Sequence, residues 1–99
     1  MSIDKDQKGV FLLFEFDVSE LFESNRHSFE CVADFSKYWH FDEHTKADEM
    51  IFNIDGDTKQ FLKQITALGN AGAPQGFISY LKYARDKGAK YVLFFNKGK

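Results

Sequence analysis

The stretch that decides the fold is residues 74–96, PQGFISYLKYARDKGAKYVLFFN. Apolar residues recur in its first half at helical spacing, at Phe77, Ile78, Leu81 and Ala84. Gly88 then suits the end of a helix, because glycine adopts the left-handed conformation that often terminates one. Residues 91–95 (YVLFF) are apolar throughout, as in strands that are covered on both faces. We therefore expect a helix followed directly by a central strand.

Three further strands are expected. Residues 10–14 (VFLLF) repeat the apolar character of 91–95, so we expect a second central strand over residues 10–16. Residues 28–41 start with apolar and polar residues in alternation, which favours a strand, with 37–41 continuing it or bending away. Residues 49–54 (EMIFNI) form the remaining strand, before the turn pair Asp55-Gly56.

Two more helices are expected between these strands. Ser19 is a suitable N-cap for a short helix ending near residue 25. Asp57 or Thr58 caps a longer helix that Gly69 terminates. The order β-α-β-β-α-α-β predicts an α+β (or α/β) fold with a mixed sheet of about four strands and helices packed on it. We expect a single domain over residues 1–99, with a loose lead-in at residues 1–8. The long link from 49–54 to 91–95 allows these two strands to be parallel neighbours.

Composition fits one globular domain. The chain has 99 residues, 43% hydrophobic and 28% charged, which is enough for one core. Aromatic residues reach 17%, with twelve Phe, so we expect a core of large rings and some rings at the surface. The single cysteine, Cys31, and the lack of an export-signal layout predict a cytoplasmic protein that does not enter a membrane.

Charge is divided along the chain. Residues 15–57 contain twelve acidic residues and three basic ones, whereas residues 58–99 contain one acidic residue and eight basic ones. The net charge of −2 hides this division. An acidic half of this kind favours a basic partner.

Catalytic motifs are weak. Asp55 and Asp57 after a strand resemble a phosphotransferase signature, but Lys59 occupies the position where that signature needs Thr or Val. A turn followed by a helix cap explains the two aspartates without catalysis. The expectation is a protein that is not an enzyme and carries no cofactor, with a small enzyme built on Asp55 and Asp57 as the alternative.

Two other groups of residues could form a metal site or a nucleic-acid site, and both have simpler explanations. His40 and His44 lie four residues apart near Asp42, Glu43 and Asp48. Two histidines at this spacing lie on the same face only in a helix, whereas residues 42–48 are expected to form an exposed loop. Basic residues of the last helix could contact nucleic acid, at Lys82, Arg85, Lys87 and Lys90. Because the acidic half would repel phosphate, nucleic-acid binding is kept only as a second alternative.

The best candidate site combines acidic residues with aromatic rings. Acidic groups steer a basic partner, and rings anchor it. The partner-binding residues we predict are Tyr38, Trp39, Asp42, Glu43, Asp48, Glu49, Asp55 and Asp57. A solvated acidic loop over buried rings is the competing interpretation.

In size, expected compartment, lack of a catalytic motif and charge division, the chain resembles the small cytosolic immunity proteins of bacterial toxin–immunity pairs, including those of contact-dependent growth inhibition. The resemblance implies a compact, cofactor-free domain whose acidic surface blocks a basic nuclease toxin. It rests on no sequence motif, so it assigns no residue a role.

Overall fold

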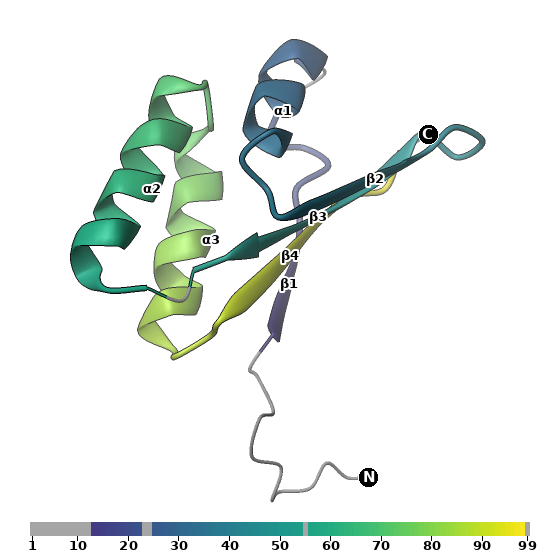
Figure 1. The fold of residues 1–99 in the computed structure, drawn as a ribbon. Helices are drawn as coiled ribbons and strands as arrows, with labels where there is room; N and C mark the ends of the chain where they lie inside the picture. Colours follow the sequence, from purple (N-terminus) through teal and green to yellow (C-terminus); the bar gives the residue numbers. More distant parts are fainter. Residues whose placement is uncertain (1–12, 23–24, 55, 99) are drawn as a thin grey trace, which may run out of the picture.

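The computed structural model describes residues 13–22, 25–54 and 56–98, which form one four-stranded sheet and three helices (Figure 1). In chain order the elements are β1 (Leu13–Asp17), α1 (Arg26–Ala33), β2 (Tyr38–Asp42), β3 (Ala47–Asn53), α2 (Thr58–Asn70), α3 (Gln75–Asp86) and β4 (Tyr91–Asn96). This order confirms the predicted α+β fold with a mixed sheet. The expected lead-in at 1–8 lies outside the described residues.

The strand order in the sheet is β1-β4-β3-β2. β4 is central, as predicted, and pairs with β1 in parallel and with β3 antiparallel. The prediction of a second central strand at residues 10–16 is wrong in position: the described part of that strand, β1, lies at an edge. The prediction of parallel neighbours is also wrong for β3 and β4, which are antiparallel; the parallel partner of β4 is β1.

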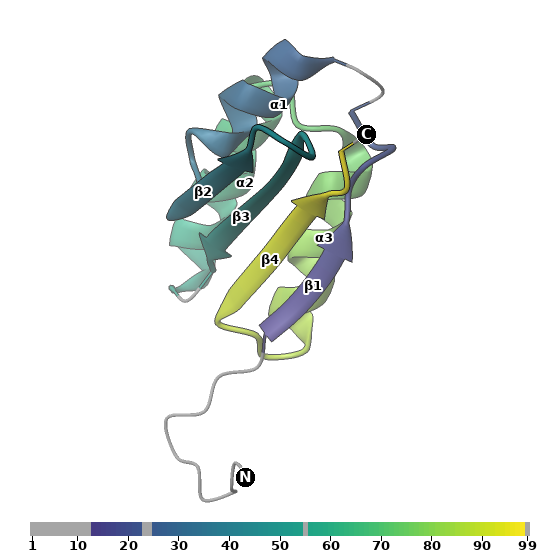
Figure 2. The ribbon, with the colours of Figure 1, turned by 90° about the vertical axis from the view of Figure 1, so that its right-hand side faces the viewer.

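All three helices cover the same face of the sheet (Figure 1). The face that they cover carries the core, centred on Phe52, Phe77 and Phe94, none of which is exposed. The ring centroids of Phe77 and Phe94 are 4.2 Å apart, and Phe16 stacks on Tyr80 at the same distance. Figure 2 views the sheet from its second face: the four strands stand in front of the helices, and none of the helices in the described residues lies on this face.

The first helix differs from its prediction. Residues 26–33 form α1, whereas a strand was expected over 28–41; residues 19–22 form turns instead of the expected helix. Two observations explain the difference. The Asn25 side chain caps α1 by accepting a hydrogen bond from the Ser28 N–H at 3.1 Å. Phe29, Val32 and Ala33, spaced as on one helix face, are all buried, and this burial outweighs the alternating pattern.

The other helices begin and end through local hydrogen bonds. Asp57 and Gln60 form a capping box at the start of α2, as expected for a cap at Asp57. The prediction that Gly69 ends this helix is wrong by one residue, because α2 runs to Asn70 and Gly72 takes the left-handed conformation, with φ of 104°. Gly88, with φ of 86°, does the same after α3, as predicted.

Candidate protein-binding surface

The uncovered side of the sheet, which we call the open face, is built by the outward side chains of the four strands (Figure 2). Strand register places these side chains in rows across the sheet. One row consists of Tyr38, Ile51, Leu93 and Glu15. The next row consists of His40, Glu49, Phe95 and Asp17. The rows give the open face an apolar centre with acidic residues around it.

Exposure agrees with this arrangement. Tyr38 is 49% exposed, and Ile51, Leu93 and Phe95 are partly exposed although they are apolar. Glu15 and Glu49 are exposed beside them. A contiguous apolar patch with a polar margin is typical of a protein-binding surface.

The open face is also acidic. The four strands contain no Lys or Arg over the ranges given above. Lys97 directly follows β4, and its Nζ lies 3.3 Å from an oxygen of Asp17. The negative charge of Glu15, Glu49 and Asp42 is therefore not balanced by cations within the strands.

Two carboxylates at the ends of the strands are stabilised in their charged form. The Asp17 carboxylate accepts hydrogen bonds from the Ser19 hydroxyl and N–H, which lower its pKa. The Asp42 carboxylate accepts a hydrogen bond from the His44 N–H at 2.9 Å, which lowers its pKa as well. These local bonds keep the margin of the open face negative in mildly acidic solution.

The opposite side of the molecule is basic. The helices α2 and α3 carry exposed Lys59, Lys63 and Lys82, with Lys87 directly after α3. The division of charge along the chain thus becomes a division between two layers, an acidic sheet and a basic helical layer.

Four predicted partner-binding residues lie on or beside the open face. Tyr38, Asp42 and Glu49 point outward from β2 and β3, and Glu43 is exposed in the turn between these strands. The structure brings these four together at one side of the sheet.

Trp39 and Asp48 lie on the other face, in the core side of the sheet. The side chain of Asp48 is fully buried, so its prediction as a partner-binding residue does not agree with its position. Asp48 instead accepts four hydrogen bonds: two from Arg26, at 2.7 and 3.0 Å, one from the Trp39 indole N–H at 2.9 Å and one from Asn96 at 3.0 Å. The hydrogen bond from its indole N–H to Asp48 holds Trp39 on the inner face of the sheet.

The buried Asp48 carboxylate is ionised. Burial alone would raise its pKa, but the hydrogen bonds from Arg26, Trp39 and Asn96 outweigh burial and place the pKa below its usual range. A buried carboxylate with this many donors is a structural element, because its oxygens have no capacity left for a partner.

Of the remaining two predicted residues, Asp57 does not belong to this surface. Asp57 caps α2, where its side chain accepts a hydrogen bond from the Gln60 N–H at 2.8 Å. Asp55 lies outside the described residues. The turn-and-cap interpretation thus accounts for Asp57.

Sequence reasoning missed the apolar centre of the open face. Leu93 and Phe95 belong to a run predicted to be covered on both faces, because an uninterrupted apolar run suggests burial on both sides, and Ile51 belongs to a strand for which no face was predicted. A signal for Asp48 was present: alternation extended back from Met50 and Phe52 places Asp48 on the inner face. Arg26, one of only three basic residues in the acidic half, was the other available signal.

The structure bears on the metal site and on one residue of the basic helix. There, no three side chains of His, Cys, Asp or Glu are grouped so that they could hold a metal ion. Arg85, a member of the basic helix, donates to the carbonyl oxygens of Ile54 and Gly56 at 3.1 and 3.0 Å, so it joins α3 to the end of β3.

No family model, curated protein or solved structure matches this chain. None of the helices in the described residues combines the length and apolar character needed to cross a membrane.

Proposed function

We propose that this protein is a non-catalytic binding protein that neutralises a basic protein partner through the open face. The observation that supports this most strongly is that apolar and acidic side chains lie side by side on a sheet face on which no helix of the described residues packs. Apolar side chains such as Leu93 and Phe95 would be buried on binding, and Glu15 and Glu49 would attract and orient a basic surface.

A nuclease toxin is the class of basic partner that fits best. A nuclease must present a positively charged cleft to the phosphate backbone of its substrate. An acidic surface can compete with that substrate for the same cleft, and the immunity proteins that this chain resembles act in this way in the cytosol. The proposal includes a cytoplasmic location, in keeping with a single, unpaired Cys31.

Differential capture tests the proposal. The protein is immobilised in three forms: wild type, Glu15→Lys/Glu49→Lys on the open face, and Asp34→Lys/Asp86→Lys on the helical side. All four acidic residues are exposed, and both double variants change the net charge by the same amount, so only the position of the change differs. The immobilised proteins are incubated with a lysate of the source cell, and the retained proteins are identified.

The expected partner is a basic protein that is retained by wild type and by the helical-side variant but lost by the open-face variant. If it is a nuclease, adding the wild-type protein at equal concentration should stop its cleavage of nucleic acid. An acidic partner, or a partner lost only in the helical-side variant, would contradict the proposed function.

A further inference from the structure

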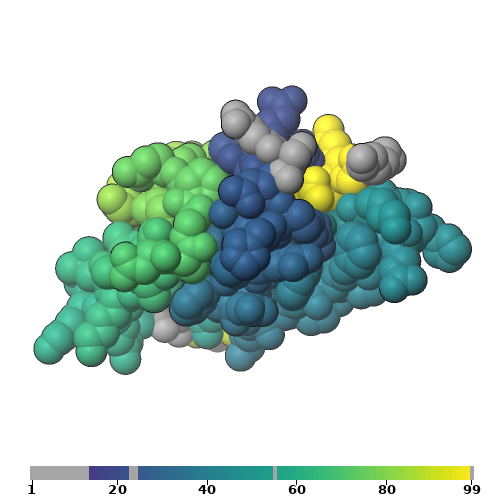
Figure 3. Space-filling model, turned by 90° about the horizontal axis from the view of Figure 1, so that it is seen from above, coloured from purple at the N-terminus to yellow at the C-terminus, as the bar shows by residue number. Residues whose placement is uncertain are grey.

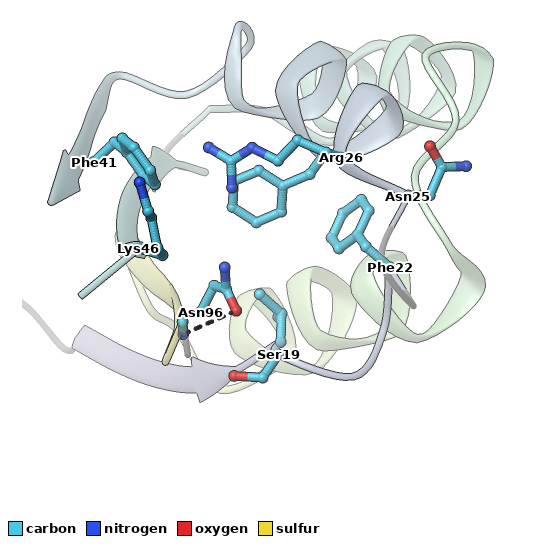
Figure 4. A pocket seen from close by; sticks show the side chains of 10 residues that line it. Ser19, Phe22, Asn25, Arg26, Phe41, Lys46 and Asn96 are labelled. Atoms are coloured by element: carbon cyan, nitrogen blue, oxygen red, sulfur yellow. Dashed lines mark hydrogen bonds between the residues drawn. The ribbon is translucent and has the colours of Figure 1, made fainter. Parts of the chain in front are cut away.

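A pocket of about 430 Å³ lies where α1, the β2–β3 turn and the end of β4 meet (Figure 4). Figure 3 looks onto the end of the molecule where these segments come together. The pocket lies on the helical side of the sheet, so it is separate from the open face. Its volume is within the range of small-molecule sites, about 300–1,000 Å³. The pocket is therefore a candidate ligand site that the proposed function does not use.

The apolar part of the pocket is aromatic. Phe22, Phe29 and Phe41 line it from three different segments of the chain. Phe41 is 36% exposed, although it pairs with the buried Asp48 on the inner face of the sheet. Rings arranged around an open space favour a flat apolar ligand, which can stack against them.

Arg26 forms a preorganised cationic wall. Its Cζ lies 4.8 Å from the centroid of the Phe29 ring and 4.9 Å from that of Phe41, and its guanidinium is held by Asp48 and, through Nε, by Glu30 at 3.1 Å. Three of its five N–H groups are engaged in these hydrogen bonds. The position of the guanidinium is thus fixed before a ligand arrives, which lowers the entropy cost of binding.

Lys46 supplies the charge that is not balanced. Its ammonium lies 5.9 Å from the centroid of the Phe41 ring, and it forms no salt bridge with any described residue. Among the described residues that line the pocket, none is acidic. Asp48 and Glu30 more than offset the charge of Arg26, so among the described lining residues Lys46 is the cation whose charge has no acidic partner.

We propose that this pocket binds a small aromatic carboxylate. The ring would lie among Phe22, Phe29 and Phe41, and the single negative charge would face Lys46 and Arg26, as the side chains in Figure 4 allow. A phosphate dianion is disfavoured, because the carboxylates of Asp48 and Glu30 bind the Arg26 guanidinium and would repel a second negative charge. A cationic ligand is disfavoured by both basic residues.

The test is a titration of the protein with 2-naphthoate, followed by two-dimensional ¹H–¹⁵N NMR. The matched probe is 2-naphthamide, which keeps the ring and replaces the carboxylate by a neutral amide. Naphthoate should bind with a Kd of about 1 mM or lower, given the size of the ligand. It should shift the signals of the Arg26 Nε–H and of the Asn25 and Asn96 side-chain amides, which belong to the pocket lining.

The variant Lys46→Asn tests the charge without endangering the fold. Lys46 has φ of 64°, a conformation that asparagine tolerates better than most residues. We expect about tenfold weaker binding of naphthoate, as for loss of a charge-assisted contact, and unchanged binding of naphthamide. The matched control is Lys63→Asn on the exposed surface of α2, which should leave both affinities unchanged.

Four results would overturn the proposal. One is the absence of shifts at the pocket signals up to 10 mM naphthoate, on the order of tenfold above the expected Kd. Another is equal affinity for naphthoate and naphthamide, or equal affinity of wild type and Lys46→Asn for naphthoate. The last is that inorganic phosphate shifts the same signals as strongly as naphthoate, which would indicate a simple anion site.

Discussion

Asp48 and Glu49 are neighbours in β3, yet they lie on opposite faces of the sheet and have different surroundings. The carboxylate of Asp48 is buried and accepts four hydrogen bonds, whereas Glu49 is exposed beside Phe95 on the open face. Phe94 and Phe95 in β4 form a second such pair: Phe94 is fully buried and Phe95 is partly exposed. The inner face therefore holds the fold together, and the outer face is available for binding.

The Phe pair should give the largest difference in stability. Phe94→Ala removes a ring that packs against Phe52 and Phe77, so we expect a loss of about 3–5 kcal/mol in the free energy of unfolding. Phe95→Ala, on the open face, should cost only about 1 kcal/mol, since it loses cross-strand contacts and creates no cavity. Denaturant titrations of both variants measure the difference. Equal losses would mean that the open face is covered in solution.

The acidic pair, Asp48 and Glu49, should also differ in stability, with the larger loss of unfolding free energy at the inner residue, Asp48. Asp48→Asn removes the charge that Arg26 faces and presents an amide to groups that are themselves donors, so we expect a loss of about 3 kcal/mol in unfolding free energy. Glu49→Gln should change it by less than about 0.5 kcal/mol, as for an ordinary surface residue. Thermal or denaturant unfolding at neutral pH distinguishes the two. A costly Glu49→Gln and a harmless Asp48→Asn would reverse the assignment of the faces.

The stabilisation by Asp48 should depend on pH. Its pKa is lower in the folded than in the unfolded protein, so the unfolded state binds the proton more readily and stability falls in acid. The contribution should be complete above about pH 5 and decrease as the pH falls through about 4, the unfolded value, and below. The gap in unfolding free energy between wild type and Asp48→Asn should therefore narrow in acid. A gap that stays constant between neutral pH and about pH 3 would contradict this role.

The sequence predicted the element types and order because the strongest patterns, in residues 74–96 and around the Asp57 cap, involve local contacts. It misplaced α1, because the alternation of Phe29, Cys31 and Ala33 competes with the helical spacing of Phe29, Val32 and Ala33, and only packing on the sheet decides between them. It also could not show that β4 is covered on one face only. The burial of Asp48 depends on Arg26, 22 residues away in sequence, and on Asn96, 48 away, and such distant pairing has no local signal.

The exposed ring of the open face should act as an anchor for the partner. Tyr38→Ala should mainly speed dissociation of the complex, by about tenfold, because large aromatic residues in an interface often dominate its lifetime. Trp39→Phe serves as a control, since Trp39 points inward and bonds Asp48. Dissociation rates from surface-binding kinetics give the comparison. A larger effect of Trp39→Phe, in a protein shown to be folded, would place the interface elsewhere.

The most direct measurement is the association rate of the captured partner with wild type, Glu15→Lys/Glu49→Lys and Asp34→Lys/Asp86→Lys at several salt concentrations. If the acidic open face attracts the partner, the open-face variant should associate about tenfold more slowly at low salt, and the difference should shrink as the Debye length falls below about 10 Å. The helical-side variant, with the same net charge, should stay within about threefold of wild type. An association rate that does not depend on salt, or a greater loss in the helical-side variant, would contradict binding through the open face.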